Sequence, residues 1–144
     1  MGALTWREGS TRLAYPAGYD FTSSGANFEP TFQGVKLGSG GTAGQVVPCA
    51  ANTDEIIGVI MNCPLGGVGD TADILSVNSQ GTGKVQAGGT IAVGNYLTMD
   101  SSGHAVAATQ TTAGSQPVVR VFGRALNAAA SGSLVEFQIL YFLY

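Results

Sequence analysis

The C-terminal stretch Leu134-Val-Glu-Phe-Gln-Ile-Leu-Tyr-Phe-Leu-Tyr144 has the alternation of a β-strand and indicates the fold class of this chain. Successive side chains of a strand point to opposite faces, and every second residue from Val135 to Leu143 is apolar or aromatic. The other face begins polar, with Glu136 and Gln138, and ends apolar. When one face of a strand is solvated, that face stays polar along the whole strand. This pattern therefore predicts burial of both faces at the chain end.

The apolar end of that second face predicts a contact with another subunit. The end of a chain normally lies at the surface of a lone domain. Burying Leu140 and Phe142 would contribute about 1.5–3 kcal/mol each. A subunit interface meets this need, and a strand running through the middle of a single core is the alternative.

The rest of the chain is typical of many short strands separated by glycine-rich turns. Glycine accounts for 22 of the 144 residues and interrupts nearly every window long enough for a helix. Turns recur about every 8–12 residues, which predicts an all-β fold, a compact Gly-rich β-barrel or sandwich. Residues 125–130 form the one plausible helical turn, with a loop as the alternative. Strands are expected at residues 31–37, 45–50, 55–62, 71–77, 83–87, 96–100, 104–109, 117–125 and 133–144.

Two strand-like runs resemble each other. Ile56-Ile-Gly-Val-Ile60 and Val121-Phe-Gly-Arg-Ala125 each hold one glycine, and they follow Gly44-Gln-Val-Val and Gly94-Asn-Tyr-Leu respectively. Glycine inside a strand usually marks a bulge or a tight corner. The resemblance suggests two similar half-barrels.

The first 30 residues differ from the remainder. Aromatic side chains are separated there by Gly, Pro, Ser and Asn without a sustained period. We therefore expect an irregular N-terminal arm at residues 1–30 and a β-barrel-like domain at residues 31–144, which ends in the C-terminal interface strand. An arm of this kind must place its aromatics on its own domain or on a partner, and both remain open.

Composition favours a protein that packs against other protein. Charged residues make up 10% of the chain, against roughly a quarter in ordinary soluble domains. The net charge of −3 and scattered basic residues argue against nucleic acid as a partner. The chain shows neither a signal peptide nor about 18 consecutive apolar residues, so we expect no membrane and synthesis in a cytoplasm.

No catalytic motif emerges. Gly83-Lys84 lacks the rest of a phosphate-binding loop, and the single histidine, His104, is expected to be a solvated turn residue. Asp70 and Asp73 suit a polar turn, with a cation site or a hydrolase pair as alternatives. We expect no enzyme activity, no cofactor and no metal.

The two cysteines, Cys49 and Cys63, each adjoin a proline. They are expected to be small apolar residues at strand ends. A disulfide requires that their strands pair, and a metal site is disfavoured because the chain has one histidine and no CxxC.

Three stretches carry a resemblance to a known family: Gly67-Val-Gly-Asp70, the run from Val85 to Val106 with Ile91-Ala-Val-Gly-Asn-Tyr-Leu-Thr-Met-Asp100, and the run from Val121 to Phe137. They resemble the small decoration, or cement, proteins of tailed bacteriophage heads. The resemblance spans roughly residues 55–140 and rests on Gly-rich motifs.

The resemblance implies a β-barrel-like domain that binds as a homotrimer to the outer surface of the phage head. There it would tie neighbouring subunits of the major capsid protein together and stabilise the shell, with no catalytic residues. Two other classes remain open: a carbohydrate- or adhesin-type β-rich binding module, and a minor virion spike or tail component.

Given that resemblance, two sets of residues are expected to make the contacts. Buried aromatic and arginine side chains dominate interface energies. The residues expected to contact the capsid are Trp6, Arg7, Tyr15, Tyr19 and Phe21. The residues expected to close the trimer are Leu140, Phe142 and Tyr144.

Overall fold

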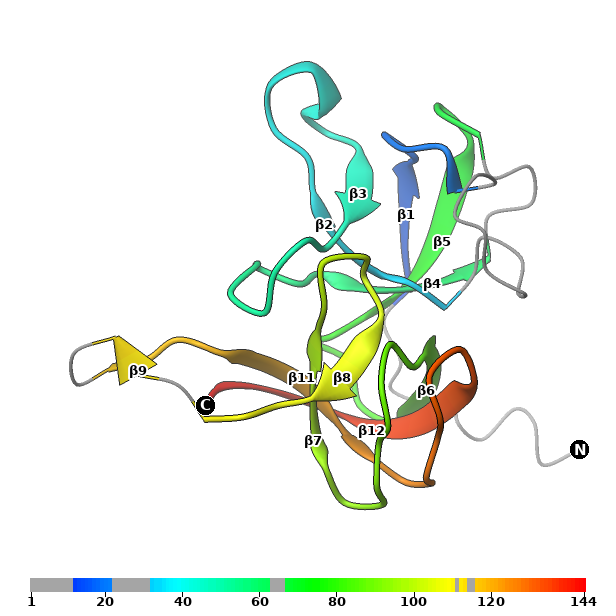
Figure 1. Ribbon diagram of the computed structural model, residues 1–144. Coiled ribbons are helices and arrows are strands. Elements are labelled where there is room, and N and C mark those ends of the chain that lie inside the picture. The colour runs from blue at the N-terminus through cyan, green and yellow to red at the C-terminus, as the bar shows by residue number, and fades with distance from the viewer. Residues whose placement is uncertain (1–11, 22–31, 63–66, 111, 114–115) are drawn as a thin grey trace, which may run out of the picture.

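The computed structural model describes residues 12–21, 32–62, 67–110, 112–113 and 116–144. The fold is all-β, as predicted, with two five-stranded antiparallel sheets that do not close into barrels (Figure 1). The first sheet contains, in order across it, β1 (Arg12–Pro16), β5 (Thr71–Ser76), β4 (Gly58–Asn62), β2 (Gly34–Leu37) and β3 (Val46–Pro48). The second contains β6 (Thr82–Gln86), β12 (Leu134–Leu143), β11 (Arg120–Ala125), β7 (Tyr96–Met99) and β8 (Ala105–Ala107).

Smaller elements complete the described chain. The two-residue strands β9 (Thr112–Ala113) and β10 (Gln116–Pro117) pair with each other, and the 3-10 turn η3 (Gly40–Thr42) lies between β2 and β3. Residues 126–130 form a loop, in which Ala129 bridges Ile91, so the helical turn is not formed. Among the described residues, no helix is long and apolar enough to cross a membrane.

Every range expected to hold a strand contains one, whereas β1 lies in the segment assigned to the arm. Of residues 1–30, the structure describes 12–21. There Arg12–Pro16 pairs with Thr71–Leu75 of β5 along its whole length. Local sequence could not indicate β1, because its partner lies about 60 residues away.

The two sheets have the same topology. Matching β1 to β6, β2 to β7, β3 to β8, β4 to β11 and β5 to β12 converts the strand order of the first sheet into that of the second. The registers agree as well, since Gly58 lies opposite Ser76 and Val35, and Gly123 lies opposite Ile139 and Leu97. The chain is therefore a structural duplication, with a first half at residues 12–77 and a second half at residues 82–144.

Hydrogen bonds outside the strands repeat between the halves. The Gly18 N–H donates to the Val46 carbonyl at 2.8 Å, and the Gly88 N–H donates to the Ala105 carbonyl at 2.8 Å. Next to them, Ala17 and Ala87 form parallel bridges to Val46 and Ala105. Each bridge joins the end of one edge strand, β1 or β6, to the other edge strand of the same sheet, β3 or β8. Each sheet therefore curls strongly without closing into a barrel.

The echo noticed in the sequence corresponds to β4 and β11, which occupy the same place in the two sheets. The glycines at its centre, Gly58 and Gly123, are equivalent in register. The segments beginning at Gly44 and Gly94 are not equivalent, because the first leads into β3 and the second into β7.

The cores of the two halves are also equivalent, but a second layer joins them. Ile60 and Ile74 belong to the core of the first half, together with Ala17, Phe21, Val35, Val46 and Ala72. Val59 and Leu75, on the opposite face of the same strands, belong to the core of the second half. Burying each of these two side chains contributes about 1.5–3 kcal/mol. Because both belong to the core of the second half, that core is complete only when the first sheet covers it.

Close backbone approach makes this junction possible. The Gly34 N–H donates to the Gly103 carbonyl at 2.8 Å, and the Gln86 N–H donates to the Phe32 carbonyl at 2.9 Å. A Cβ atom on Gly34 would overlap the side chain of Met99. A larger residue at position 34 would therefore displace Met99 where the two halves meet.

We predict that Gly58→Ala lowers stability by about 1–3 kcal/mol, because a new Cβ would overlap the Leu75 carbonyl oxygen and Ile74 Cγ2. Gly41→Ala is the matched control, since nothing lies within 4 Å of its Cβ position. Urea denaturation measures both variants. Equal unfolding midpoints for the two would contradict the close packing of β4 on β5.

Candidate functional site

An aromatic patch lies on the outer side of the second sheet. We define it as Tyr96, Phe142 and Tyr144. The Tyr96 ring lies edge-on to Phe142 at 5.1 Å between centroids and to Tyr144 at 5.4 Å. Tyr96 remains 37% exposed, and Phe142 and Tyr144 are half-buried. Exposed apolar side chains that gather in this way are typical of an interaction surface.

The patch contains two of the three residues expected at a subunit interface. Phe142 and Tyr144 belong to it, and Leu140 is half-buried earlier in β12. Tyr96 was not predicted, because only the order of β7, β11 and β12 in the sheet brings it to the chain end. No local signal in the sequence distinguishes it from an ordinary strand residue.

The first part of β12 alternates as expected from the sequence. At the end of the strand Tyr141 is 37% exposed and Leu143 is 48% exposed, so the burial of both faces predicted there is not found within one chain. Val135 and Phe137 are fully or almost fully buried, whereas Glu136 and Gln138 are exposed. Farther along, the Tyr141 hydroxyl accepts a hydrogen bond from Arg120 at 3.2 Å. The polar half of the outer face is thus solvated, and the apolar half carries the aromatic patch.

The residues expected to contact the capsid have different environments. Trp6 and Arg7 lie outside the described residues. Tyr15 is half-buried against the first core, and Tyr19 is 41% exposed. Phe21 differs from the expectation of a partner-facing side chain. It is 1% exposed and packs edge-on against Tyr19 at 5.3 Å, because the first half needs a large apolar residue in its core.

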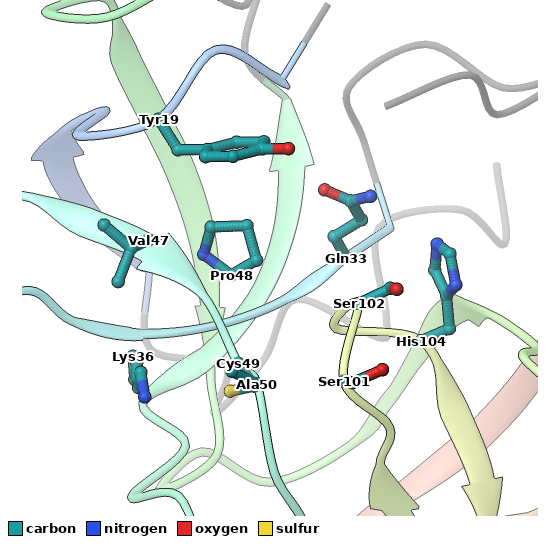
Figure 2. Close-up of a pocket in the computed structure, with 10 residues that line it drawn as sticks. All are labelled: Tyr19, Gln33, Lys36, Val47, Pro48, Cys49, Ala50, Ser101, Ser102 and His104. Atoms are coloured by element: carbon teal, nitrogen blue, oxygen red, sulfur yellow. The ribbon is translucent and has the colours of Figure 1, made fainter. Parts of the chain in front are cut away.

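A groove of about 490 Å³ lies where β2 and β3 of the first half face the β7–β8 turn of the second (Figure 2). Both polar and apolar side chains line the groove, which is open to solvent. The groove is lined by Tyr19, Gln33, Lys36, Val47, Pro48, Cys49, Ala50, Ser101, Ser102 and His104.

The charged residues beside the groove are already paired. Lys36 Nζ lies 2.8 Å from Asp54 Oδ1, and Asp54 Oδ2 accepts N–H groups from Ala50 at 2.6 Å and Ala51 at 3.1 Å. Partial burial opposes ionisation of Asp54, but the Lys36 ammonium and these N–H groups outweigh it and lower the pKa of the carboxyl. The pair therefore holds the loop after β3 in place.

The thiol of Cys49 is a poor nucleophile. Burial, together with the nearby Asp54 carboxylate, raises its pKa to about 12 against the opposing effect of Lys36. The thiolate is the reactive form of cysteine, so Cys49 stays protonated at neutral pH. It is a free, buried residue just after β3, as expected for a small apolar residue at a strand end, and Cys63 lies outside the described residues.

His104 is not the solvated turn residue expected from the sequence. Its side chain is 20% exposed, Nδ1 lies 3.7 Å from Asp100 Oδ2, and Nε2 is buried without a hydrogen-bond partner. Gln33 Oε1 is likewise buried and unpartnered. Both residues line the groove. Their unpartnered polar atoms are available for hydrogen bonds to ordered water or to backbone groups.

The two aspartates considered for a cation site make separate contacts. Asp73 forms an ion pair with Arg12 across β1 and β5, and the Asp70 carbonyl accepts the Ala17 N–H at 2.7 Å. In the part of the chain that the structure describes, no group of three or more His, Cys, Asp or Glu residues could hold a metal ion.

Comparison with known proteins shows a similarity of fold and none of sequence family. No protein-family model matches the chain, and no curated protein matches it in sequence. The fold is similar to the crystal structure of the N base of head fiber gp8.5 in bacteriophage phi29, with a TM-score of 0.62 and 21% sequence identity. The match covers 91% of this chain and 94% of that chain, so both have the same overall fold.

We predict that Cys49 resists modification until the protein unfolds. In a Cys63→Ser variant, a thiol-reactive disulfide reagent at about pH 8 should react at least about 100-fold more slowly with native protein than in concentrated urea. Equal rates in the two solvents would contradict the burial of Cys49.

The same thiol gives a pH dependence with a definite sign. The pKa of the thiol is near its ordinary value of 9.0 in the unfolded chain and about 12 in the folded protein. Its contribution to stability is therefore fully present below about pH 9 and is lost as the pH rises toward 12. Urea midpoints of the Cys63→Ser protein should fall over that window more steeply than those of a Cys49→Ala, Cys63→Ser control.

Proposed function

We propose that this protein is a structural component of a tailed-phage head, which binds as a trimer to the outer capsid surface and stabilises the shell. The observation that carries the proposal is the fold shared with the phi29 head fiber base over almost the whole of both chains. The family resemblance of residues 55–140 points independently to the same class of protein. The partners would be the major capsid protein and further copies of this chain.

The surface chemistry supports a role in assembly. The chain has few charges, and it exposes aromatic and aliphatic side chains on the second sheet. Interfaces between proteins are rich in aromatic residues and poor in charged ones at their centre. Many copies on one shell make weak individual contacts sufficient, because their effects combine.

Support for a non-enzymatic role comes from the groove. Its cysteine is protonated, its lysine is paired with Asp54, and its histidine lies beside Asp100. We therefore propose that the groove is structural and that no catalytic step occurs there.

A second candidate function is the base of a head fibre rather than a cement protein. It is favoured by the similarity to a fiber base, which covers 94% of that chain. The two functions differ in number of copies, since a cement protein occupies every equivalent position on the shell. Saturating stoichiometry on heads separates them.

The test is co-sedimentation of the purified protein with phage heads produced without it. We expect saturable binding and a higher melting temperature of the decorated heads. A protein that stays in the supernatant at all concentrations would refute the proposal. Light scattering of the free protein should give about three times 14.6 kDa.

We predict that Trp6→Ala with Arg7→Ala weakens head binding at least tenfold, because large aromatic and arginine side chains carry much of an interface's energy. The matched control is Val68→Ala, since Val68 is 67% exposed on a loop of the first half. The substitutions leave β1 intact, whereas deleting residues beyond 11 would remove a strand of the first sheet. Full occupancy by the double variant would refute the predicted role of the arm.

A further inference from the structure

The duplication provides an internal standard for every surface. Each paired position on a strand of one half has a counterpart in the other half. A sheet face that is buried in the first half can therefore be compared with its counterpart in the second. The relevant face of the first sheet is formed by Gly34, Val59 and Leu75, which lie side by side on β2, β4 and β5. We call it the docking face, because it covers the core of the second half.

The counterpart of the docking face is uncovered. The register places Tyr96, Arg124 and Gln138 side by side on β7, β11 and β12 in the positions of Gly34, Val59 and Leu75. Arg124 and Gln138 are exposed, and Tyr96 belongs to the aromatic patch.

Flanking residues repeat this contrast. Met61, three residues after Gly58, packs against the core of the second half, whereas Leu126, three residues after Gly123, is 45% exposed. Val93, just before Tyr96 in the chain, is 66% exposed. The face that is covered in the first half is thus open and apolar at its margins in the second.

The surface that receives the docking face has a counterpart as well. Met99 and Gly103 of the second half receive Gly34, through packing and through the hydrogen bond to the Gly103 carbonyl. The corresponding residues of the first half are Leu37 and Gly44, at the end of β2 and just before β3. Met99 is 1% exposed because the docking face covers it, while Leu37 is 48% exposed.

We infer that the counterpart docking face of one copy binds the Leu37 surface of a second copy, head to tail, as the first half binds the second within one chain. The inference rests on the self-association proposed above. A contact between two different surfaces leaves one of each free at the ends, so it propagates until the ring closes. Three copies joined in this way form a ring of six similar β units.

The contact between copies differs from the contact within a chain. Pro16 stands in the position of Gln86 and has no N–H, so the hydrogen bond that Gln86 donates to Phe32 has no counterpart. Tyr96 stands where Gly34 stands, which keeps the two backbones farther apart. The rings of the aromatic patch fill that added space, and Tyr96 meets Leu37.

The experiment is site-specific photo-crosslinking with the full chain. Benzoylphenylalanine replaces Leu37, and unlabelled and ¹⁵N-labelled copies are mixed so that bonds between copies carry both isotopes. We expect bonds from position 37 to residues 93–96 or 138–144 of another copy. Bonds only to the first half of another copy, or none between copies in a protein that light scattering finds to be oligomeric, would overturn the pairing while leaving the trimer standing.

Charge substitution gives an independent readout. Leu37→Glu and Tyr96→Arg should each weaken self-association at least tenfold, and combining them in one chain should restore it, because position 37 of one copy meets position 96 of the next. Val68→Glu is the control and should keep the parent mass. Failure of the combined variant to regain mass, with far-ultraviolet circular dichroism unchanged, would overturn the inference.

Failure of this inference is distinguishable from failure of the proposed function. A chain that is monomeric at every concentration overturns both the head-to-tail pairing and the preassembled trimer. Co-sedimentation with heads still decides capsid binding in that case, because the crosslinking and charge variants lie outside the residues proposed to contact the capsid.

Discussion

The structure depends on the burial of one sheet face. The first sheet has a core on each side, since Ile60 and Ile74 pack within the first half while Val59 and Leu75 pack into the second. Removing apolar area from water is the main favourable contribution to folding, and separating the halves would expose Val59, Leu75 and the core of the second half that they cover. The two halves therefore stabilise each other, and the groove between them has a fixed geometry.

The many glycines have a steric role at this junction as well as a conformational one in turns. Gly34 and Gly83 leave room for Met99 and Leu75, respectively, where the halves meet. A sheet that is packed on both sides cannot spare the volume of extra methyl groups, because protein interiors are packed as densely as organic crystals. This constraint links the glycine content of the chain to the architecture.

The duplication also shows where the halves diverge. Their backbones and core positions correspond, but the docking face carries Val59 and Leu75 in one half and Arg124 and Gln138 in the other. Beside the polar pair stands the aromatic patch. A chain with 10% charged residues that keeps such a surface open is suited to assembly with other proteins, in line with the role proposed on the phage head.

The sequence by itself determined the all-β class, the position of most strands and the apolar end of β12, because alternation and turn residues are local signals. It also predicted Phe142 and Tyr144 as interface residues, and both lie in the aromatic patch. Only the tertiary structure decided that β1 pairs with β5, that Phe21 is a core residue and that Tyr96 joins the aromatic patch. These depend on which distant strands become neighbours, and no local pattern encodes that. The full duplication emerged in the same way, since equivalent strands share backbone register while few of their side chains are alike.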